Sequence, residues 1–322
     1  MFKVIMAPTD GSDLERPAIA MAVRLAKRFD AELRLVRVET PPVAVDPTSS
    51  PGVLEITEET VAEGRRSRLG KLEALGAECR ALGEIRVTTA LEDGIVSPTL
   101  MDYAKRVSAD MIVMSSHARG GLKRVALGSV TDYLIRRADI PVLVVKPSVS
   151  SEDGDPSQTF NRILVPLDGS ALAEQILPLV ASLASRLNAT VSLVYVLTPL
   201  TYAQKEIMQP GLPWWDEDVA IANAYLTEAE EQLRKAGLSV GKEVVLSENI
   251  AAAILDYGLR MRADLIAIAT NGAGGMSRIL FGGVADEITR KSGVSLVVFH
   301  PGQIKHRPEN STGKEAKNHL PV

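Results

Sequence analysis

The sequence predicts an α/β protein of two tandem, doubly wound domains, each with five strands in a parallel sheet. Two observations predict this fold. Short apolar runs of strand length alternate with amphipathic helical stretches, and this order places helices on both faces of an open sheet. The whole pattern then occurs twice, since Asp10 corresponds to Asp168 and Asp110 corresponds to Asp264. A repeat of this length indicates two copies of one domain.

The first copy contains five strand-length runs that are bounded by polar or turn-forming residues, as is typical of buried parallel strands. They are Phe2–Pro8, Ala31–Val38, Glu84–Leu91, Met111–Met114 and Pro141–Lys146. Between them lie helical stretches that begin near Leu14 and span Glu55–Leu82, Ser97–Ser108 and Thr131–Arg137. Ser12 followed by Glu15 has the form of a capping box for the first helix.

Composition marks the boundaries between the copies. Residues 148–159 are rich in Ser, Asp, Gly and Pro, which predicts a linker. The first domain is then 1–147 and the second is 160–301. Residues 302–322 are polar and lack periodicity, so they predict a mobile tail.

Charge and composition argue against several classes of function. The formal net charge of −4 gives no electrostatic basis for binding nucleic acid or an anionic membrane. No apolar run approaches the ~18 residues of a membrane span, and no secretory signal precedes Val4. With the single cysteine Cys79 there is no intrachain disulfide, and the sequence predicts a cytoplasmic protein. His300, His306 and His319 lie at or in the tail, so no histidine cluster predicts a metal site.

Each copy also contains a strand, a loop of small residues and a helix start, over Met111–Val130 and Leu265–Val284. Such a loop is suited to holding a phosphate group, because helix N-termini expose backbone N–H groups and a favourable dipole. Gly128 allows close approach of the backbone, and Ser129 adds a hydroxyl ligand.

The two-copy pattern resembles the universal stress protein family in its tandem form, over Phe2 to Pro301. The resemblance rests on motifs that occur in the same order in both copies: Pro-Thr-Asp-Gly-Ser at 8–12, Pro-Leu-Asp-Gly-Ser at 166–170, Ala-Asp-Met-Ile-Val-Met at 109–114, Ala-Asp-Leu-Ile-Ala-Ile at 263–268, and the two Gly-rich loops. It implies a Rossmann-like, adenine nucleotide alpha hydrolase-like fold. It also implies an intrachain pseudo-dimer through the last strands, Val142–Val145 against Leu296–Phe299.

The resemblance implies a nucleotide site in each domain, with ATP as the ligand. In the first domain its residues are Pro8, Thr9, Asp10, Val38, Met114, Ser115, His117, Ala118, Gly128, Ser129 and Val130. In the second they are Pro166, Leu167, Asp168, Val196, Ala269, Gly272, Gly282, Gly283 and Val284. By resemblance the aspartates border the nucleoside, Val38 and Val196 lie beside the adenine, and Gly128 to Val130 hold the phosphates. Mg²⁺ or Mn²⁺ is expected on the phosphates, since no carboxylate cage is visible.

Neither copy matches the family's nucleotide-binding pattern of Gly, two residues, Gly, nine residues, Gly, then Ser or Thr. The first has Ser115 and Ala118 in place of the two early glycines, and the second has Ala269 and Gly283 in place of the first Gly and the hydroxyl. Purely structural interpretations of some of these residues also stay open. Asp10 and Asp168 suit turn residues as well as ligand contacts, and His117 suits a solvated loop as well as a phosphate contact.

Three functional hypotheses follow. The first is an ATP-binding, nucleotide-dependent regulator in the stress response that signals to an unknown protein partner. The second is a stress-response scaffold with degenerate pockets that acts by protein–protein contacts. The third, an ATP-consuming enzyme, is the weakest, because no Gly-x-Ser-x-Gly elbow or Walker A loop occurs and no catalytic residue stands out. Slow ATP hydrolysis would be incidental, and a homodimer of the tandem chain is compatible with the sequence.

Overall fold

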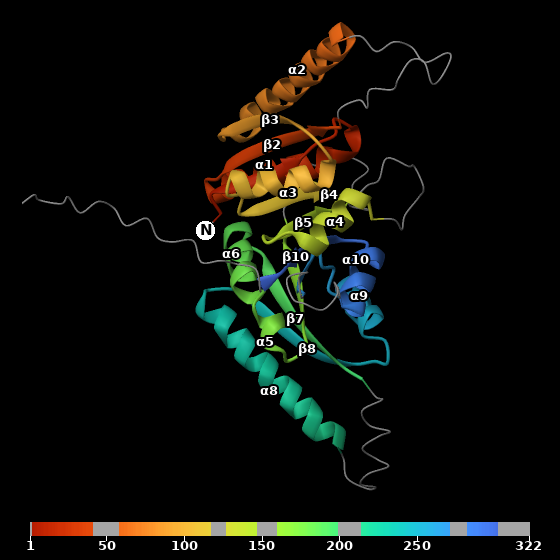
Figure 1. The fold of residues 1–322 in the computed structure, drawn as a ribbon. Coiled ribbons are helices and arrows are strands. Elements are labelled where there is room, and N and C mark those ends of the chain that lie inside the picture. Colours follow the sequence, from red (N-terminus) through yellow and green to blue (C-terminus); the bar gives the residue numbers. More distant parts are fainter. Residues whose placement is uncertain are drawn as a thin grey trace, which may run out of the picture.

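The computed structural model describes residues 2–40, 58–116, 127–146, 160–198, 214–270 and 282–301. Ten strands in these ranges form one continuous sheet in the order β3-β2-β1-β4-β5-β10-β9-β6-β7-β8 (Figure 1). The strands of the first domain are β1 (Val4–Pro8), β2 (Glu32–Glu39), β3 (Val87–Asp93), β4 (Met111–Ser115) and β5 (Val142–Val145). Those of the second are β6 (Arg162–Leu167), β7 (Thr190–Leu197), β8 (Val240–Leu246), β9 (Leu265–Ala269) and β10 (Ser295–Phe299).

Helices cover both faces of this sheet, as the doubly wound prediction requires. One face is covered by α1 (Arg16–Phe29), α2 (Glu58–Gly83), α5 (Ala171–Glu174), α6 (Leu177–Leu187) and α8 (Trp214–Lys235), with the 3-10 turn η1 (Asp13–Glu15) before α1. The other is covered by α3 (Val96–Arg106), α4 (Ser129–Arg137), α9 (Ile250–Arg260) and α10 (Gly283–Lys291). Each layer has its own apolar core, since successive side chains of a strand point to opposite faces.

The five predicted strands of the first domain are all present, with ends that differ by up to three residues. The third strand is displaced most, because α2 continues to Gly83 and is followed by Glu84, whose backbone is left-handed with φ of 51°. The strand then begins only at Val87, where it meets Leu33 of β2. Helix α2 continues past Gly64, Gly70 and Gly76 because Leu72 and Cys79 pack into the core, exposing only 3% and 1% of their surface.

The two domains meet at β5 and β10, which pair antiparallel with Leu143 opposite Val297. Every other pairing in the sheet is parallel, within a domain. The predicted pseudo-dimer through the last strands is therefore confirmed. In Figure 1, α2 and α8 consequently lie at opposite ends of the molecule, beside the outermost strands β3 and β8.

Polar contacts between related positions also cross this junction. Arg136 donates to Asp286 at 2.6 Å, and Arg290 lies 4.0 Å from Asp132, so two pseudo-symmetric Asp–Arg pairs form a ring of four charges. His300 is not part of a tail but is 1% exposed, with Nε2 bonded to the carbonyl of Ile135 in the other domain.

Lys146 stands at the position in the first domain that corresponds to His300. Its Nζ donates to the carbonyls of Thr289 and Ser292, at 3.2 and 2.5 Å. Each domain thus places a nitrogen donor at the C-terminal end of the other domain's last helix, where carbonyls lack helical partners.

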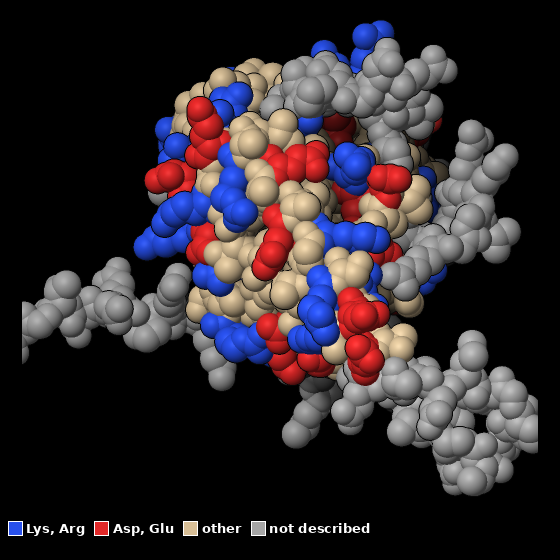
Figure 2. Space-filling model, turned by 90° about the horizontal axis from the view of Figure 1, so that it is seen from above, with Lys and Arg blue, Asp and Glu red and all other residues tan. Residues whose placement is uncertain are grey.

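On the face shown in Figure 2, basic and acidic side chains are interspersed. No helix within the described ranges has the length and apolar character that crossing a bilayer requires.

Candidate functional site

A cavity of about 1060 Å³ opens at the carboxyl ends of β1, β2 and β4 in the first domain. This is the edge where ligands of open parallel sheets bind. Nine of the residues predicted for the first nucleotide site line it, namely Pro8, Thr9, Asp10, Val38, Met114, Ser115, Gly128, Ser129 and Val130. His117 and Ala118 lie outside the described residues.

One end of the cavity is formed by the N-terminus of α4. Gly128 is the N-cap residue and has an extended backbone, and its carbonyl accepts the first helical bond from the N–H of Asp132 at 2.8 Å. The N–H groups of Ser129, Val130 and Thr131 therefore have no acceptor within the helix. The hydroxyl of Thr131 donates a hydrogen bond to the carbonyl of Ser115 at 3.1 Å. This end of the cavity thus presents N–H donors and the positive end of a helix dipole, which suit a phosphate.

The middle of the cavity has an apolar wall. Val36, Val38, Val96, Leu100 and Met114 contribute to it from strands β2 and β4 and helix α3. Met114 and Leu100 expose only 7% and 2% of their surface, so the wall is anchored in the core below. A flat apolar group such as a nucleobase gains free energy by burial against such a wall.

The turn after β1 forms the floor between these regions. Asp10 accepts a bond from the N–H of Ser12 at 2.9 Å, and Gly11 has a φ of +82° that a side chain would strain. Asp10 therefore does stabilise the turn, which was one of the two roles that the sequence allowed for it.

The capping-box prediction is wrong for the first domain. Ser12 makes no side-chain cap bond. Glu15 instead accepts bonds from the hydroxyl of Thr9 at 2.6 Å and the N–H of Asp10 at 2.7 Å. Burial raises the pKa of the Glu15 carboxyl to about 7, against the opposing effect of these two donors.

The second domain keeps the geometry but alters its chemistry. Its predicted site residues lie at equivalent places: Pro166 and Leu167 end β6, Asp168 follows it, Val196 is in β7, Ala269 ends β9, Gly282 caps α10, and Gly283 and Val284 begin that helix. Gly272 lies outside the described residues. Asp168 accepts bonds from both the N–H and the hydroxyl of Ser170, at 3.0 and 2.6 Å.

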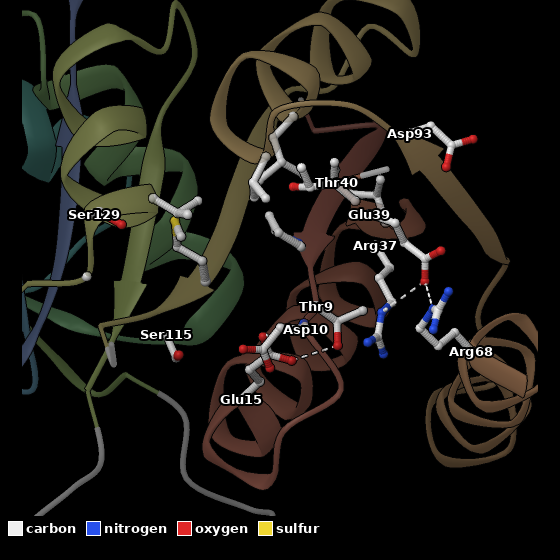
Figure 3. Close-up of a pocket in the computed structure, with 18 of the residues that line it drawn as sticks. Thr9, Asp10, Glu15, Arg37, Glu39, Thr40, Arg68, Asp93, Ser115 and Ser129 are labelled. Carbon is white, nitrogen blue, oxygen red and sulfur yellow. Dashed lines mark hydrogen bonds and ion pairs between the residues drawn. The ribbon is translucent and has the colours of Figure 1, made fainter. Parts of the chain in front are cut away.

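The prediction missed a group of charged residues on the far side of the first cavity. We call Arg37, Glu39, Arg65, Arg68 and Asp93 the arginine cluster; all five line the cavity. Figure 3 shows Ser115 and Ser129 on one side, Thr9, Asp10 and Glu15 at the centre, and Arg37, Glu39, Arg68 and Asp93 on the other side. A signal was present in the sequence, since Arg65 and Arg68 share one helix face and Arg37 and Glu39 share one side of a strand.

A match to a protein-family model agrees with this fold. The model described as the universal stress protein family matches residues 1–146 and again residues 159–300. The chain belongs to the universal stress protein family. Both copies found in the sequence are thus universal stress protein domains.

Curated relatives agree with this assignment. A universal stress protein of Mycolicibacterium smegmatis is 27% identical over 304 residues, which cover 92% of this chain and 97% of the relative. Universal stress protein MJ0531 of Methanocaldococcus jannaschii is 34% identical over 149 residues, covering 45% of this chain and 83% of the relative.

Solved structures share the tandem fold. The crystal structure of a universal stress protein from Archaeoglobus fulgidus aligns with a TM-score of 0.68 and 18% identity, covering 93% of this chain and 98% of that one. The functionally unknown protein PA1789 from Pseudomonas aeruginosa aligns with a TM-score of 0.63 and 17% identity, covering 93% of each chain.

A metal held by protein ligands alone has no evident site in the described part of this universal stress protein. There, no three His, Cys, Asp or Glu side chains come together as a metal site requires. Asp10 and Glu15 are neighbours in the cavity, but both accept backbone N–H groups.

Proposed function

We propose that this universal stress protein binds an adenine nucleotide in the cavity of its first domain and acts as a nucleotide-dependent regulator in the cytoplasmic stress response. One observation carries the proposal: a single cavity joins the open N-terminus of α4 to the apolar wall around Val38 and Met114. A nucleotide needs both, an anion site for its phosphates and an apolar surface for its base.

In this proposal each part of the nucleotide would contact a different group of residues. The N–H groups of Ser129 and Val130, with the Ser129 hydroxyl, would hold the phosphates of ATP. Asp10 would border the ribose while it keeps its turn, and Val38 would lie beside the adenine. Mg²⁺ or Mn²⁺ would arrive on the phosphates, where it supplies charge neutralisation.

We propose a binder and not an efficient enzyme. Burial raises the pKa of Glu15 to about 7, which would suit a general base, but the oxygens of this carboxyl are already used by Thr9 and Asp10. Regulation would then depend on occupancy, with a protein partner that reads the occupied state.

The second domain favours the alternative function, a scaffold that acts through protein contacts. Gly283 stands where Ser129 lies in the first domain, so the start of α10 lacks the hydroxyl. We therefore expect the nucleotide in the first domain and a mainly structural role for the second.

The test is to denature freshly purified protein and quantify the released nucleotide per chain. We expect about one ATP per chain, and we expect Ser129→Ala to reduce retention about tenfold, because it removes a hydrogen bond to a charged group. Ser67→Ala, on the exposed side of α2, is the matched control and should retain wild-type occupancy. If no nucleotide is released and added Mg-ATP does not raise the melting temperature, the scaffold function is the better one.

A further inference from the structure

The arginine cluster lies at the end of the cavity opposite the start of α4, and its cations converge on one carboxylate. Arg68 Nε is bonded to Glu39, Arg65 Nη1 lies 3.8 Å from Glu39 and 2.5 Å from Asp93, and Arg37 Nε lies 4.0 Å from Glu39. Glu39 is nearly buried, with 12% of its side chain exposed. The cluster is therefore an organised group at the cavity wall and not a set of independent surface charges.

The second domain serves as an internal comparison for this cluster. Arg80 of α2 and Arg234 of α8 donate to equivalent carbonyls, of Val87 and Val240, which aligns the two helices. The helix alignment and the register of the strands together assign an equivalent residue in the second domain to each of the five members of the cluster. All five equivalents are uncharged. The equivalents of Arg37, Glu39, Arg65, Arg68 and Asp93 are Tyr195, Leu197, Val219, Ala222 and Leu246. Packing of this helix on the sheet therefore does not require charge, and the cluster is particular to the first domain.

Charge and donor counts indicate what the cluster can bind. Within the cluster, three guanidinium groups face two carboxylates, Glu39 and Asp93, which leaves the cluster one positive charge in excess; the other two carboxylates of the cavity lining, Asp10 and Glu15, belong to the turn after β1 and to η1. Each guanidinium has five N–H donors, and the contacts within the cluster use Nε of Arg68 and Nη1 of Arg65. Arg65 and Arg68 both line the cavity, and their side chains are 42% and 38% exposed, so neither guanidinium is enclosed by its contacts within the cluster. Arginine groups of this kind bind phosphate in a bidentate manner.

The distance across the cavity, from the start of α4 to the arginine cluster, suits a single ligand that contacts both ends of the cavity. β1 separates β2 from β4 in the sheet, so the ends of β2 and β4 lie about 10 Å apart. Arg37 shortens the gap, because its Nη1 extends back to the turn at Gly11, 2.6 Å from the position of a Cβ there. Asp10, which would border the ribose in the proposed nucleotide complex, precedes Gly11 in this turn and lines the cavity.

We propose that the arginine cluster is a second phosphate site, and that the first domain, besides ATP, accepts a nucleotide with a phosphate on its ribose in addition to its 5′ phosphates. The 5′ phosphates lie at the start of α4, the nucleoside crosses β1, and the ribose phosphate meets Arg37 and Arg68. This inference rests on the proposed nucleotide-binding function and adds a ligand class to it.

The experiment is isothermal titration of the full chain, stripped of nucleotide, with ATP, with AMP and with adenosine 3′,5′-bisphosphate. We expect the wild-type protein to bind the bisphosphate about tenfold more tightly than AMP, as one charge-assisted contact predicts. Arg68→Ala should reduce this ratio to about twofold or less. Arg66→Ala is the matched control, since it removes the same charge from an exposed position of α2 and should keep the full ratio.

The outcomes separate the two claims. Equal affinities for AMP and the bisphosphate in the wild-type protein, or an unchanged ratio in Arg68→Ala, overturn the second phosphate site while ATP binding upholds the proposed function. If none of the three nucleotides binds, both claims fall. Arg65→Ala is a second variant that gives the same test should Arg68→Ala not fold, and thermal melts of each variant establish folding.

Discussion

Glu15 illustrates how one side chain shapes the cavity floor of the first domain. Its carboxylate accepts the hydroxyl of Thr9 and the N–H of Asp10, and so holds the turn against η1. Burial nevertheless dominates, and it raises the pKa to about 7. The second domain has Ala173 at this position, and there Ser170 supplies the cap bond to the N–H of that alanine at 3.1 Å.

The raised pKa predicts how stability depends on pH. The carboxyl of Glu15 has a higher pKa in the folded state than its ordinary value of 4.5, so the folded protein holds the proton more tightly. The stabilisation that the protonated Glu15 carboxyl gives the folded state is fully present below about pH 4.5 and is lost as the pH rises through about 7. Glu15→Gln, which cannot ionise, should flatten the decline in free energy of unfolding between these values, by an amount on the order of 1–3 kcal/mol.

Urea unfolding at half-unit intervals from pH 4.5 to 8 measures this decline. Asp13→Asn is the matched control, because Asp13 lies in the same 3-10 turn with 90% of its side chain exposed. A Glu15→Gln profile that parallels the wild-type profile would show that folding does not raise the pKa of this carboxyl.

The turn and helix start after the first strand of each domain show how one motif supports two local structures. Both copies read Asp-Gly-Ser, and both aspartates accept the N–H of the serine two residues on. Beyond that they differ, since Ser170 caps α5 and Ser12 caps nothing with its side chain. Glu15 accounts for the difference, because it draws the first turn toward Thr9 and Asp10.

This divergence predicts unequal effects for the same substitution. Ser170→Ala should lower the free energy of unfolding by about 1 kcal/mol, because it removes a helix-cap hydrogen bond. Ser12→Ala should change it by less than about 0.5 kcal/mol, as is usual for a side chain without such a bond. Paired chemical denaturation curves measure both, and equal losses would mean that Ser12 also caps its helix in solution.

The ten-stranded sheet runs without a break through both domains. β5 and β10 join them through backbone bonds, and the ring of Asp132, Arg136, Asp286 and Arg290 lies between α4 and α10. The hydrogen bond from Arg290 is the main cause that lowers the pKa of Asp286, with a further bond from Arg136. Since Asp132 and Asp286 lie in the first turns of α4 and α10, the ring joins the starts of these two helices.

A double-mutant cycle measures the strength of this junction. Arg136 and Asp286 are only 22% and 32% exposed, so their pair is less screened by solvent than a surface pair. We expect a coupling energy of about 1 kcal/mol for Arg136→Ala with Asp286→Ala. The control cycle uses Arg260 and Glu243, which are 54% and 42% exposed within the second domain, and should give less than about 0.5 kcal/mol. Equal values from the two cycles would show that the junction gains nothing from the ring.

Much of the fold was predictable because it follows from local pattern. Apolar runs such as Met111–Met114 define strands, and the repeat from Asp10 to Asp168 defines two domains. Parallel connections then leave few arrangements for the sheet. The ends of elements were less predictable, as at Val87, because a helix continues wherever its apolar face finds a core to cover.

The candidate site divides in the same way. Short motifs predicted the α4 end and the turn at Asp10, since turn and helix-start residues act on their immediate neighbours. The arginine cluster needed the packed structure, because Arg68 and Glu39 are 29 residues apart and meet only when α2 lies over β2. His300 became an inter-domain donor for the same reason: its partner Ile135 is 165 residues away. A sequence specifies local geometry directly, whereas the meeting of distant side chains depends on how whole layers pack.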